Sequence, residues 1–344
     1  LLHLEILDSH ILHIYLLIAP DLLGVKSFLP LIDTHNKVVR RALRMKKTCN
    51  DLCEILVGRH VHPISATIGG FTKLPTEKEL ETILQMLSGM RPDLEATVEF
   101  ISAQRFPAFE RDTEYIALVS DNTEYPLLSG DIGSTDGLRK STREYRSVIN
   151  EFVVPHSSAK HARLSRESYA VGSLARFNLN FQKLHPKAKE VASFLGMKPK
   201  CINPYLNTAA QVIESVHCLE DSLALVERLQ QAGMRHEEAV LVGLNEQSRI
   251  PVKKGDGVGA VEVPRGTLFH NYEIDEKGII VNANCVIPTN QNLNNIEHDM
   301  KKLVPGILDR SEEEITLALE MLVRAYDPCI SCSTHLLNVR FSNR

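Results

Sequence analysis

The residues best suited to chemistry lie near the C-terminal end of the sequence, in the segment DPCISCSTH at positions 327–335. Two residues separate Cys329 from Cys332, so a tight turn can present both thiols on one side, and His335 follows three positions later. Thiolates are soft ligands that suit nickel, zinc, copper and iron. On its own, the spacing is compatible with half of a zinc site or with a redox-active dithiol.

The segment resembles the C-terminal motif of the large, catalytic subunit of nickel–iron hydrogenases. Other segments resemble motifs of the same family in the family's order: SHILH at 9–13, GRHVHP at 58–63 followed by two glycines at 69–70, GDGVGAVEVPRG at 255–266 and VIPTNQN at 286–292. The resemblance covers the chain from end to end. It implies a single hydrogenase large-subunit domain over 1–344, with an α+β, predominantly α-helical fold.

The resemblance implies a role for each matching residue. Cys329 would be a terminal thiolate ligand of nickel, and Cys332 would bridge nickel to an iron that carries carbon monoxide and cyanide. Arg265 would lie over the open coordination position, where its permanent charge and its fork of donors suit a cyanide ligand. Asp327 would orient that arginine.

Further residues would surround this centre by the same resemblance. Pro264, Pro288 and Thr289 would line the diatomic ligands of the iron. His335 and the main-chain carbonyl of Cys285 would bind a magnesium or iron ion that holds the C-terminus against the core.

One family motif is absent from the sequence. The family's first cysteine motif, R-x-C-G-x-C, precedes the segment that resembles 9–13, and this sequence starts at Leu1 without it. We therefore expect a fragment that lacks its N-terminal segment, and with it two of the four cysteine ligands.

The implied function is reversible, heterolytic cleavage of hydrogen into protons and electrons. Because the chain has no plausible cysteine set for an iron–sulfur cluster, electrons would pass to an iron–sulfur small subunit. Further subunits would serve NAD(P), a deazaflavin or a disulfide reductase, and Ser9 resembles the cytoplasmic branch of the family. A maturation endopeptidase could remove the tail after His335. Two alternatives are a quinone-site subunit like that of respiratory complex I, which lacks the cysteine motifs, and a structural zinc protein.

Composition and charge are those of an ordinary globular protein. Charged residues make up 24% and the net charge is −4, which gives no basic field for nucleic acid. The apolar run 1–24 contains Glu5, Asp8 and Asp21, so it predicts a buried helix rather than a membrane span. The cysteines indicate a reducing compartment, and Cys49 and Cys53 are predicted to pack in the core.

Helical periodicity dominates the rest of the chain. It predicts helices over 36–57, 75–103 and 184–233, and a last helix that begins at Ser311 and ends at Asp327-Pro328. Strands and turns are expected over 113–135 and 250–290, with a hairpin turn at 277–278. His10 and His13 are either satisfied core histidines or polar groups aimed at an internal site. Polar residues near 59–62 are expected close to the site or at a subunit interface.

Overall fold

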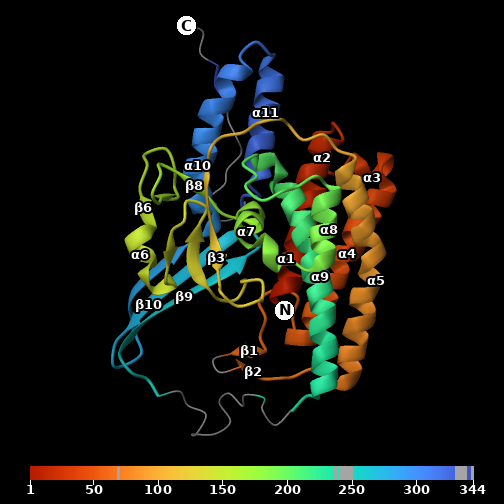
Figure 1. Ribbon diagram of the computed structural model, residues 1–344, viewed down its shortest axis with the longest axis vertical. Helices are drawn as coiled ribbons and strands as arrows, with labels where there is room; N and C mark the ends of the chain where they lie inside the picture. Colours follow the sequence, from red (N-terminus) through yellow and green to blue (C-terminus); the bar gives the residue numbers. More distant parts are fainter. Residues whose placement is uncertain (68–69, 236–238, 240–250, 330–338, 342–344) are drawn as a thin grey trace.

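The computed structural model describes residues 1–67, 70–235, 239, 251–329 and 339–341. Cys332 and His335 of the predicted metal motif lie outside these residues. Within them, the chain combines a bundle of long helices with small antiparallel sheets (Figure 1). This confirms the predicted fold class, which is α+β with helices predominant.

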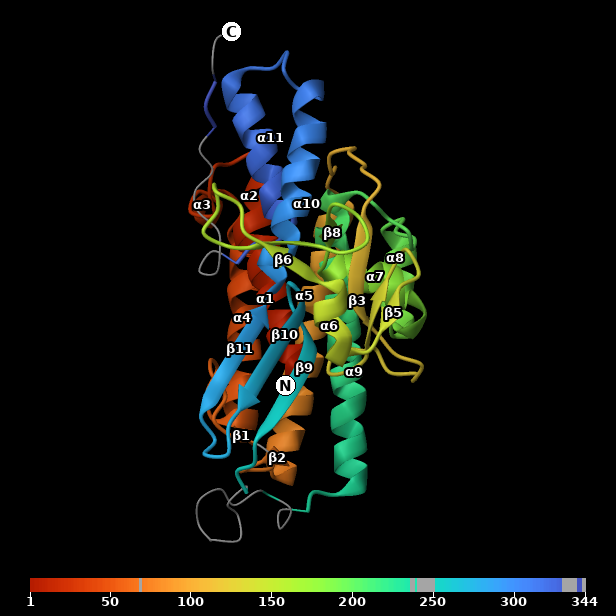
Figure 2. The same ribbon diagram turned by 90° about the vertical axis from the view of Figure 1, so that its left-hand side faces the viewer.

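Long helices lie side by side and enclose the main hydrophobic core (Figures 1 and 2). Their bounds are Leu2–Leu12 for α1, Asn36–Val57 for α4, Glu77–Ser102 for α5 and Asn207–Ala232 for α9. Each buries an apolar stripe, and Leu7, Met45, Leu52 and Ile83 are at most 1% exposed. Cys49 and Cys53 belong to the same core, as predicted.

The apolar run at the start of the chain forms α1, a π-helical turn over His13–Ile18 and α2 (Ala19–Leu22). By length and hydropathy, Leu2–Leu22 could cross a membrane, but 56% of the residues in that window are buried inside the protein. A core helix of a soluble protein passes the same test. His10 and His13 both point inward and are fully buried.

Helix boundaries follow the local signals in the sequence. Helix α4 coincides with the predicted range and ends at Gly58, whose φ of 78° is the left-handed conformation common after a helix. Thr76 and Glu79 form a capping box at the start of α5. Ser311 and Glu314 form the predicted capping box of α11 (Glu312–Ala325).

The predicted segment 184–233 is not one helix. It divides into α8 (Pro186–Phe194) and α9, separated by a turn in which Gly196 has a φ of 69° and Pro204 starts a short 3-10 turn. Two helices that periodicity did not indicate are α7 (Ser173–Asn180) and α10 (Pro288–Leu303). Short helices complete the described part of the chain: α3 (Leu31–Thr34) and α6 (Tyr145–Val148).

A three-stranded antiparallel sheet contributes to the predicted site. Strand β10 lies between its two neighbours, and its pairing with β11 ends at the predicted hairpin turn, where Gly278 has a φ of 80°. The strands are β9 (Gly255–Val263), β10 (Gly266–Ile274) and β11 (Ile280–Val286).

The smaller sheets lie apart from one another: β1 and β2 are at the lower end of the bundle, whereas β3 and β5 lie beside α7 (Figure 2). In the four-stranded sheet β3 pairs in parallel with β8 and antiparallel with β4, which pairs with β5. The bounds are β1 (Ala66–Thr67), β2 (Gly70–Phe71), β3 (Glu114–Val119), β4 (Asp131–Ser134), β5 (Arg139–Lys140), β6 (Asn150–Phe152), β7 (His161–Arg163) and β8 (Tyr169–Ala170).

Candidate metal centre

Three ends of secondary structure meet at the predicted site: the β9–β10 turn, the start of α10 and the segment after α11. Arg265 in the turn donates from Nε to the main-chain oxygen of Asp327, at 2.8 Å, and to its Oδ1, at 3.1 Å. The main-chain N–H of Cys329 donates to Oγ1 of Thr289, at 3.1 Å. Residues far apart in sequence, and each assigned to the site by resemblance, are therefore brought together.

Arg265 occupies a two-residue hairpin loop. Val263 of β9 pairs with Gly266 of β10, so only Pro264 and Arg265 connect the two strands. Gly266 has a φ of 135°, a conformation that side chains rarely adopt. The loop is tight, and it holds the Arg265 side chain 26% exposed beside the segment after α11.

Asp327 is held by side chains on two sides. It is 1% exposed, and its φ of 50° lies in the left-handed region, which aspartate adopts more readily than most side chains. Oδ1 accepts from Arg265, while Oδ2 accepts from Nε2 of Gln211 on α9, at 3.0 Å. His13 in turn lies 2.5 Å from Oε1 of Gln211. The carboxylate that orients Arg265 is thus itself oriented from within the bundle.

Beneath the turn lies a second arginine, which the sequence did not reveal. Arg176 on α7 is fully buried and donates to the carbonyls of Val263 and Pro264, each at 3.0 Å. Its guanidinium also pairs with Glu214 at 2.6 Å and with Glu262 at 2.8 Å. Arg176 therefore fixes the main chain that immediately precedes Arg265.

The pKa values of the two carboxylates beside Arg176 are shifted in opposite directions. Burial opposes the charge on Glu214, but the Arg176 guanidinium and the hydrogen bond from His10 hold its pKa well below the usual range. Burial raises the pKa of Glu262, although Arg176 and Thr267 act against that rise. Burial also lowers the pKa of His10, so this imidazole is neutral at pH 7.

The remaining predicted site residues lie in different elements around the contact of Arg265 with Asp327. Pro264 lies in the loop with Arg265, and Pro288 is the buried first residue of α10, next to Thr289. Cys285 lies opposite His270 in the β10–β11 pairing, with its side chain exposed. His335 lies outside the described residues, so the metal site that it was predicted to share with the main-chain carbonyl of Cys285 stays a prediction.

Some functional residues escaped sequence reasoning. Arg176 and Glu262 are ionisable yet buried. The signal for Arg176 would have been a single charge inside the apolar segment SLARFNL at 173–179, and that for Glu262 a single charge late in a Gly-rich strand. Arg59, His60 and His62 are exposed side chains of the segment that follows α4. Their predicted role at the site or at a subunit interface stays a prediction.

Comparisons with known proteins agree with this arrangement. The sequence model of the family described as nickel-dependent hydrogenase matches residues 138–335. The alpha subunit of sulfhydrogenase 2 from Pyrococcus furiosus is 33% identical over 339 residues, which cover 97% of this chain and 76% of that protein. A subunit of the F420-non-reducing hydrogenase from Methanothermobacter thermautotrophicus is 29% identical and matches 96% of this chain and 74% of that protein.

A solved structure shares the fold. The crystal structure of an NAD+-reducing NiFe-hydrogenase in the H2-reduced state has a TM-score of 0.80 and 24% identity, covering 97% of this chain and 78% of that one. The family model spans more than half of the chain, and a relative at 33% identity spans nearly all of it. The chain therefore belongs to the nickel-dependent hydrogenase family, as a large subunit of the kind that activates hydrogen at a nickel–iron centre.

Proposed function

We propose that Cys329 and Cys332 are thiolate ligands of the nickel–iron centre and that Arg265 and Asp327 complete the catalytic site. The observation that carries this assignment is the contact of Arg265 with Asp327, two residues before Cys329. Arginine is the side chain best suited to a charged, bidentate contact that must persist at every working pH.

The residues present fit the metal group. Cys329 is a half-buried thiol, and its main-chain N–H is held by Thr289 at the start of α10. Among the described residues, the recorded hydrogen bonds of Arg265 use Nε alone. With respect to the described residues, its terminal guanidinium nitrogens are donors that a ligand such as cyanide could use. A soft thiolate beside a fixed cation matches a metal that carries anionic ligands.

When bound, the nickel–iron group supplies the site at which hydrogen is split and from which electrons leave. The protein's own residues supply position and charge. Asp327 fixes the Nε side of Arg265, and Arg176 fixes the two carbonyls of the turn. Pro264, Pro288 and Thr289 would line the carbon monoxide and cyanide of the iron.

We also propose the third metal position that the resemblance implies. His335 and the main-chain carbonyl of Cys285 would bind magnesium or iron, which would hold the C-terminus near β11. The supporting observation is that the β11 strand of Cys285 leads within two residues into Pro288 and Thr289. The latter touches the cysteine segment through Cys329.

Relatives of the chain carry names of hydrogenase subunits, each one component of a larger enzyme. We infer that this chain likewise works beside other subunits and that its electron partner is an iron–sulfur small subunit. Subunits for NAD(P), a deazaflavin or a disulfide reductase and a maturation endopeptidase belong to the same proposal. So does a cytoplasmic location, which agrees with the buried character of the Leu2–Leu22 helix.

The test is production of the full-length protein with its neighbouring subunits and maturation proteins. We expect nickel and iron in the purified complex, infrared bands of carbon monoxide and cyanide, and hydrogen-dependent reduction of a dye. Cys329→Ser should lose nickel and activity, because a hydroxyl is a poor ligand for a soft metal.

The matched control is Cys201→Ser, since Cys201 is a half-buried thiol outside the proposed centre. It should retain nickel and activity. Full nickel retention in Cys329→Ser would refute the ligand assignment, and a zinc-containing, nickel-free complex without hydrogen uptake would refute the proposed site as a whole.

A further inference from the structure

Among the described residues, two clusters have nitrogen and oxygen atoms close enough together to bind a metal ion. Each combines two histidines with one carboxylate, which are side chains that zinc binds through nitrogen and oxygen. One cluster lies on α1 and α9, and the other joins the hairpin of β6 and β7 to α10. Neither includes a residue assigned to the nickel–iron centre. The nitrogen that carries the ring proton distinguishes the two clusters.

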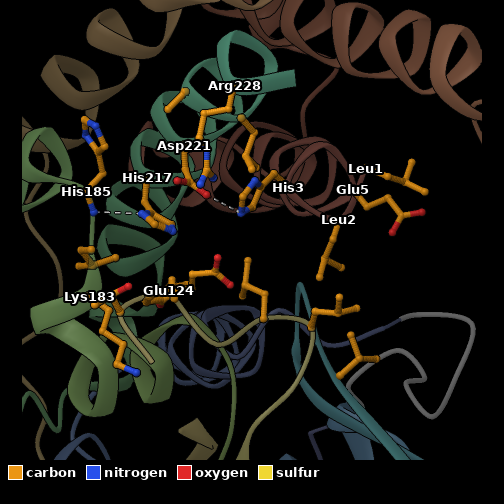
Figure 3. A pocket seen from close by; sticks show the side chains of 18 of the residues that line it. Leu1, Leu2, His3, Glu5, Glu124, Lys183, His185, His217, Asp221 and Arg228 are labelled. Atoms are coloured by element: carbon orange, nitrogen blue, oxygen red, sulfur yellow. Dashed lines mark hydrogen bonds and ion pairs between the residues drawn. The ribbon is translucent and has the colours of Figure 1, made fainter. Parts of the chain in front are cut away.

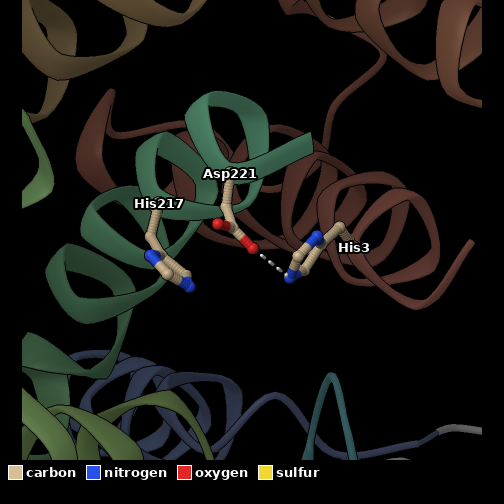
Figure 4. A group of neighbouring side chains, drawn as sticks. All are labelled: His3, His217 and Asp221. Carbon is tan, nitrogen blue, oxygen red and sulfur yellow. Dashed lines mark ion pairs between the residues drawn. The ribbon is translucent and has the colours of Figure 1, made fainter. Parts of the chain in front are cut away.

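The cluster on α1 and α9 consists of His3, His217 and Asp221, which line a cavity of about 970 Å³ (Figures 3 and 4). Nδ1 of His217 accepts the main-chain N–H of His185 at 3.0 Å, so the neutral ring carries its proton on Nε2. A metal would have to replace that proton while Nδ1 still accepted a hydrogen bond, which would leave the ring as an anion. His217 in this arrangement is therefore unsuited to be a metal ligand.

The second cluster consists of His156, His161 and Glu297, and we name it the hairpin cluster. Nε2 of His156 lies 2.6 Å and Nε2 of His161 lies 2.9 Å from the same atom, Oε1 of Glu297. The two rings are nearly perpendicular, with an interplanar angle of 85°, and their centroids are 5.8 Å apart. Both rings therefore direct Nε2 toward one point from different sides, as two ligands of a single tetrahedral ion do.

The three members of the hairpin cluster differ in exposure. His161 pairs with Phe152 across β6 and β7, and its side chain is 2% exposed. Glu297 lies on α10 with its side chain 31% exposed, and His156 lies in the loop between the two strands with its side chain 62% exposed. One ligand is thus fixed in the interior, and the open side gives water access to a fourth coordination position.

Both rings of the hairpin cluster can bind a metal through Nε2. Nδ1 of His161 is buried and has no hydrogen-bond partner within the described part of the chain. Unlike Nδ1 of His217, it can therefore carry the ring proton that a metal displaces from Nε2. The exposed His156 can donate its Nδ1 proton to water. Burial opposes the charge on Glu297, but the hydrogen bonds from His156 and His161 hold its pKa below the usual range, so the third ligand is ionised.

A small adjustment lets the hairpin cluster enclose an ion. Zinc bonds to nitrogen and oxygen are about 2.0–2.2 Å long, so the ligand atoms of a tetrahedral site lie about 3.3 Å apart. The N···O distances of 2.6 and 2.9 Å must then increase by about 0.4–0.7 Å. The exposed side chain of His156 and the partly exposed one of Glu297 can move this far while His161 stays in place.

We propose that His156, His161 and Glu297 form a zinc site that fastens the β6–β7 hairpin to α10. The site lies outside the nickel–iron centre and does not depend on the proposed function. Each histidine binds as a neutral ring through Nε2 with its proton on Nδ1, and Glu297 binds as a carboxylate. Water completes the coordination.

The hairpin already contacts α10 near its first residues, since Glu151 of β6 accepts from Nδ2 of Asn290 at 3.2 Å. Zinc at Glu297 adds a second attachment about two turns further along the helix. The affinity follows from the surroundings of His161. Metal-bound histidines usually donate from their second nitrogen to an acceptor, and loss of such a partner costs about 10–100-fold in affinity. Because Nδ1 of His161 has no partner among the described residues, we expect micromolar binding.

The test is calorimetric titration of the full chain with Zn²⁺. The background carries Cys329→Ser and Cys332→Ser, so that the proposed nickel ligands do not contribute. We expect one Zn²⁺ to bind with micromolar affinity. Co²⁺ in its place should give the visible bands of a tetrahedral site without the charge-transfer band of a thiolate. Glu297→Gln should weaken binding at least about a hundredfold, because it removes a direct ligand, whereas an outer partner alone is worth about 10–100-fold.

His298→Asn is the matched control, because His298 is the next residue of α10 and lies 3.9 Å from Glu167 instead. It should bind Zn²⁺ as the background chain does. Should Glu297→Gln fail to fold, as judged by circular dichroism, His156→Asn decides, since it changes an exposed loop residue. An affinity within threefold of the background in the folded variant would overturn the proposal, as would binding only at millimolar Zn²⁺.

A second readout is stability. Free Zn²⁺ at about 100 times its Kd should raise the folding equilibrium constant about a hundredfold, because only the folded chain brings the hairpin and α10 together. The urea midpoint of the background chain should therefore rise with Zn²⁺, and that of Glu297→Gln should not. An equal rise in both would place the ion elsewhere and overturn the site. Neither measurement uses hydrogen turnover, so failure of this proposal is distinguishable from failure of the nickel–iron assignment.

Discussion

Substitution of Gly266 by alanine perturbs the turn that presents Arg265. The added Cβ would lie 2.6 Å from Cβ of Val171, closer than packed carbon atoms allow, and 3.0 Å from the main-chain nitrogen of Gly172, which is tighter than most such contacts. The φ of 135° adds strain, because only glycine adopts it readily. The backbone must therefore move, and Arg265 is the adjacent residue.

The magnitude follows from two contributions. A side chain in a region reserved for glycine costs about 1–3 kcal/mol. Overpacking against a buried neighbour costs about 1–3 kcal/mol more. We expect Gly266→Ala to lower the free energy of unfolding by about 4 kcal/mol, a large part of the stability of an ordinary domain. Because small displacements of positioning groups cost about a hundredfold in rate, activity should fall even at temperatures where the variant is folded.

The assay is urea denaturation of the purified chain, followed by circular dichroism, together with hydrogen-dependent dye reduction by the complex. Gly259→Ala is the control: this glycine lies on β9, its added Cβ would meet nothing within 4 Å, and its φ is unexceptional. It should change stability by less than about 0.5 kcal/mol. Val171→Ala added to Gly266→Ala should restore only part of the loss, since Cβ of residue 171 remains.

The reasoning would be refuted if Gly266→Ala and Gly259→Ala had equal stability and equal activity. Loss of stability without loss of activity would refute only the inferred link between the turn and the position of Arg265. It would show that the turn can shift while Arg265 keeps its position, and that Asp327 alone holds the guanidinium.

Three further predictions concern charge and exposure. Asp327→Asn should lower turnover about tenfold, because replacing a charge-assisted hydrogen bond by a neutral one removes about 1.4 kcal/mol of positioning energy; unchanged turnover would contradict this. Burial lowers the pKa of His217 from 6.5 to about 4, so the unfolded chain binds the extra proton between these values. The free energy of unfolding should therefore fall as pH drops from 6.5 toward 4, and His217→Asn should flatten that fall in pH-dependent urea titrations. Exposed Cys285 should react with iodoacetamide in the native protein at pH 8, whereas Cys53, whose pKa burial raises to about 11, should react only after unfolding.

The sequence predicted those helices whose ends are marked by recognisable capping residues. Helix α4 has an apolar stripe and a glycine after its last residue, and α11 begins with a serine and a glutamate three positions later. Helix α10 was missed for a physical reason. Its inward face carries Gln291, Asn292 and Asn295, which look like surface residues in sequence, yet each is buried.

Those amides are buried because they bond to partners that sequence does not bring near. Asn292 accepts from the main-chain N–H of Val171 and donates to its carbonyl. Gln291 donates to the carbonyl of Thr267. Polar groups can leave water at little cost when such partners exist. Helical periodicity is detected from the spacing of apolar residues, so a helix whose buried face consists of Asn and Gln side chains gives no such signal.

For the candidate site too, the sequence did not show which distant residues are in contact. Arg265, Asp327 and Cys329 were found through family motifs, since their spacing along the chain says nothing about contact. Arg176 had no motif in our reading, although it bonds the carbonyls that precede Arg265. Its position depends on α7, β9 and α9 meeting, which is a property of the tertiary fold.

The buried charges at Arg176 cannot be explained by stability alone. Replacing a buried ion pair by well-packed apolar side chains is often neutral or stabilising, whereas removing one partner costs about 3–5 kcal/mol. An apolar residue at 176 would therefore serve the core equally well once Glu214 and Glu262 were apolar too. It could not hold the carbonyls of Val263 and Pro264, nor leave Glu214 ionised beside His10. The cluster thus fixes the turn of Arg265, and it maintains an ionised carboxylate beside His10 in the interior of the bundle.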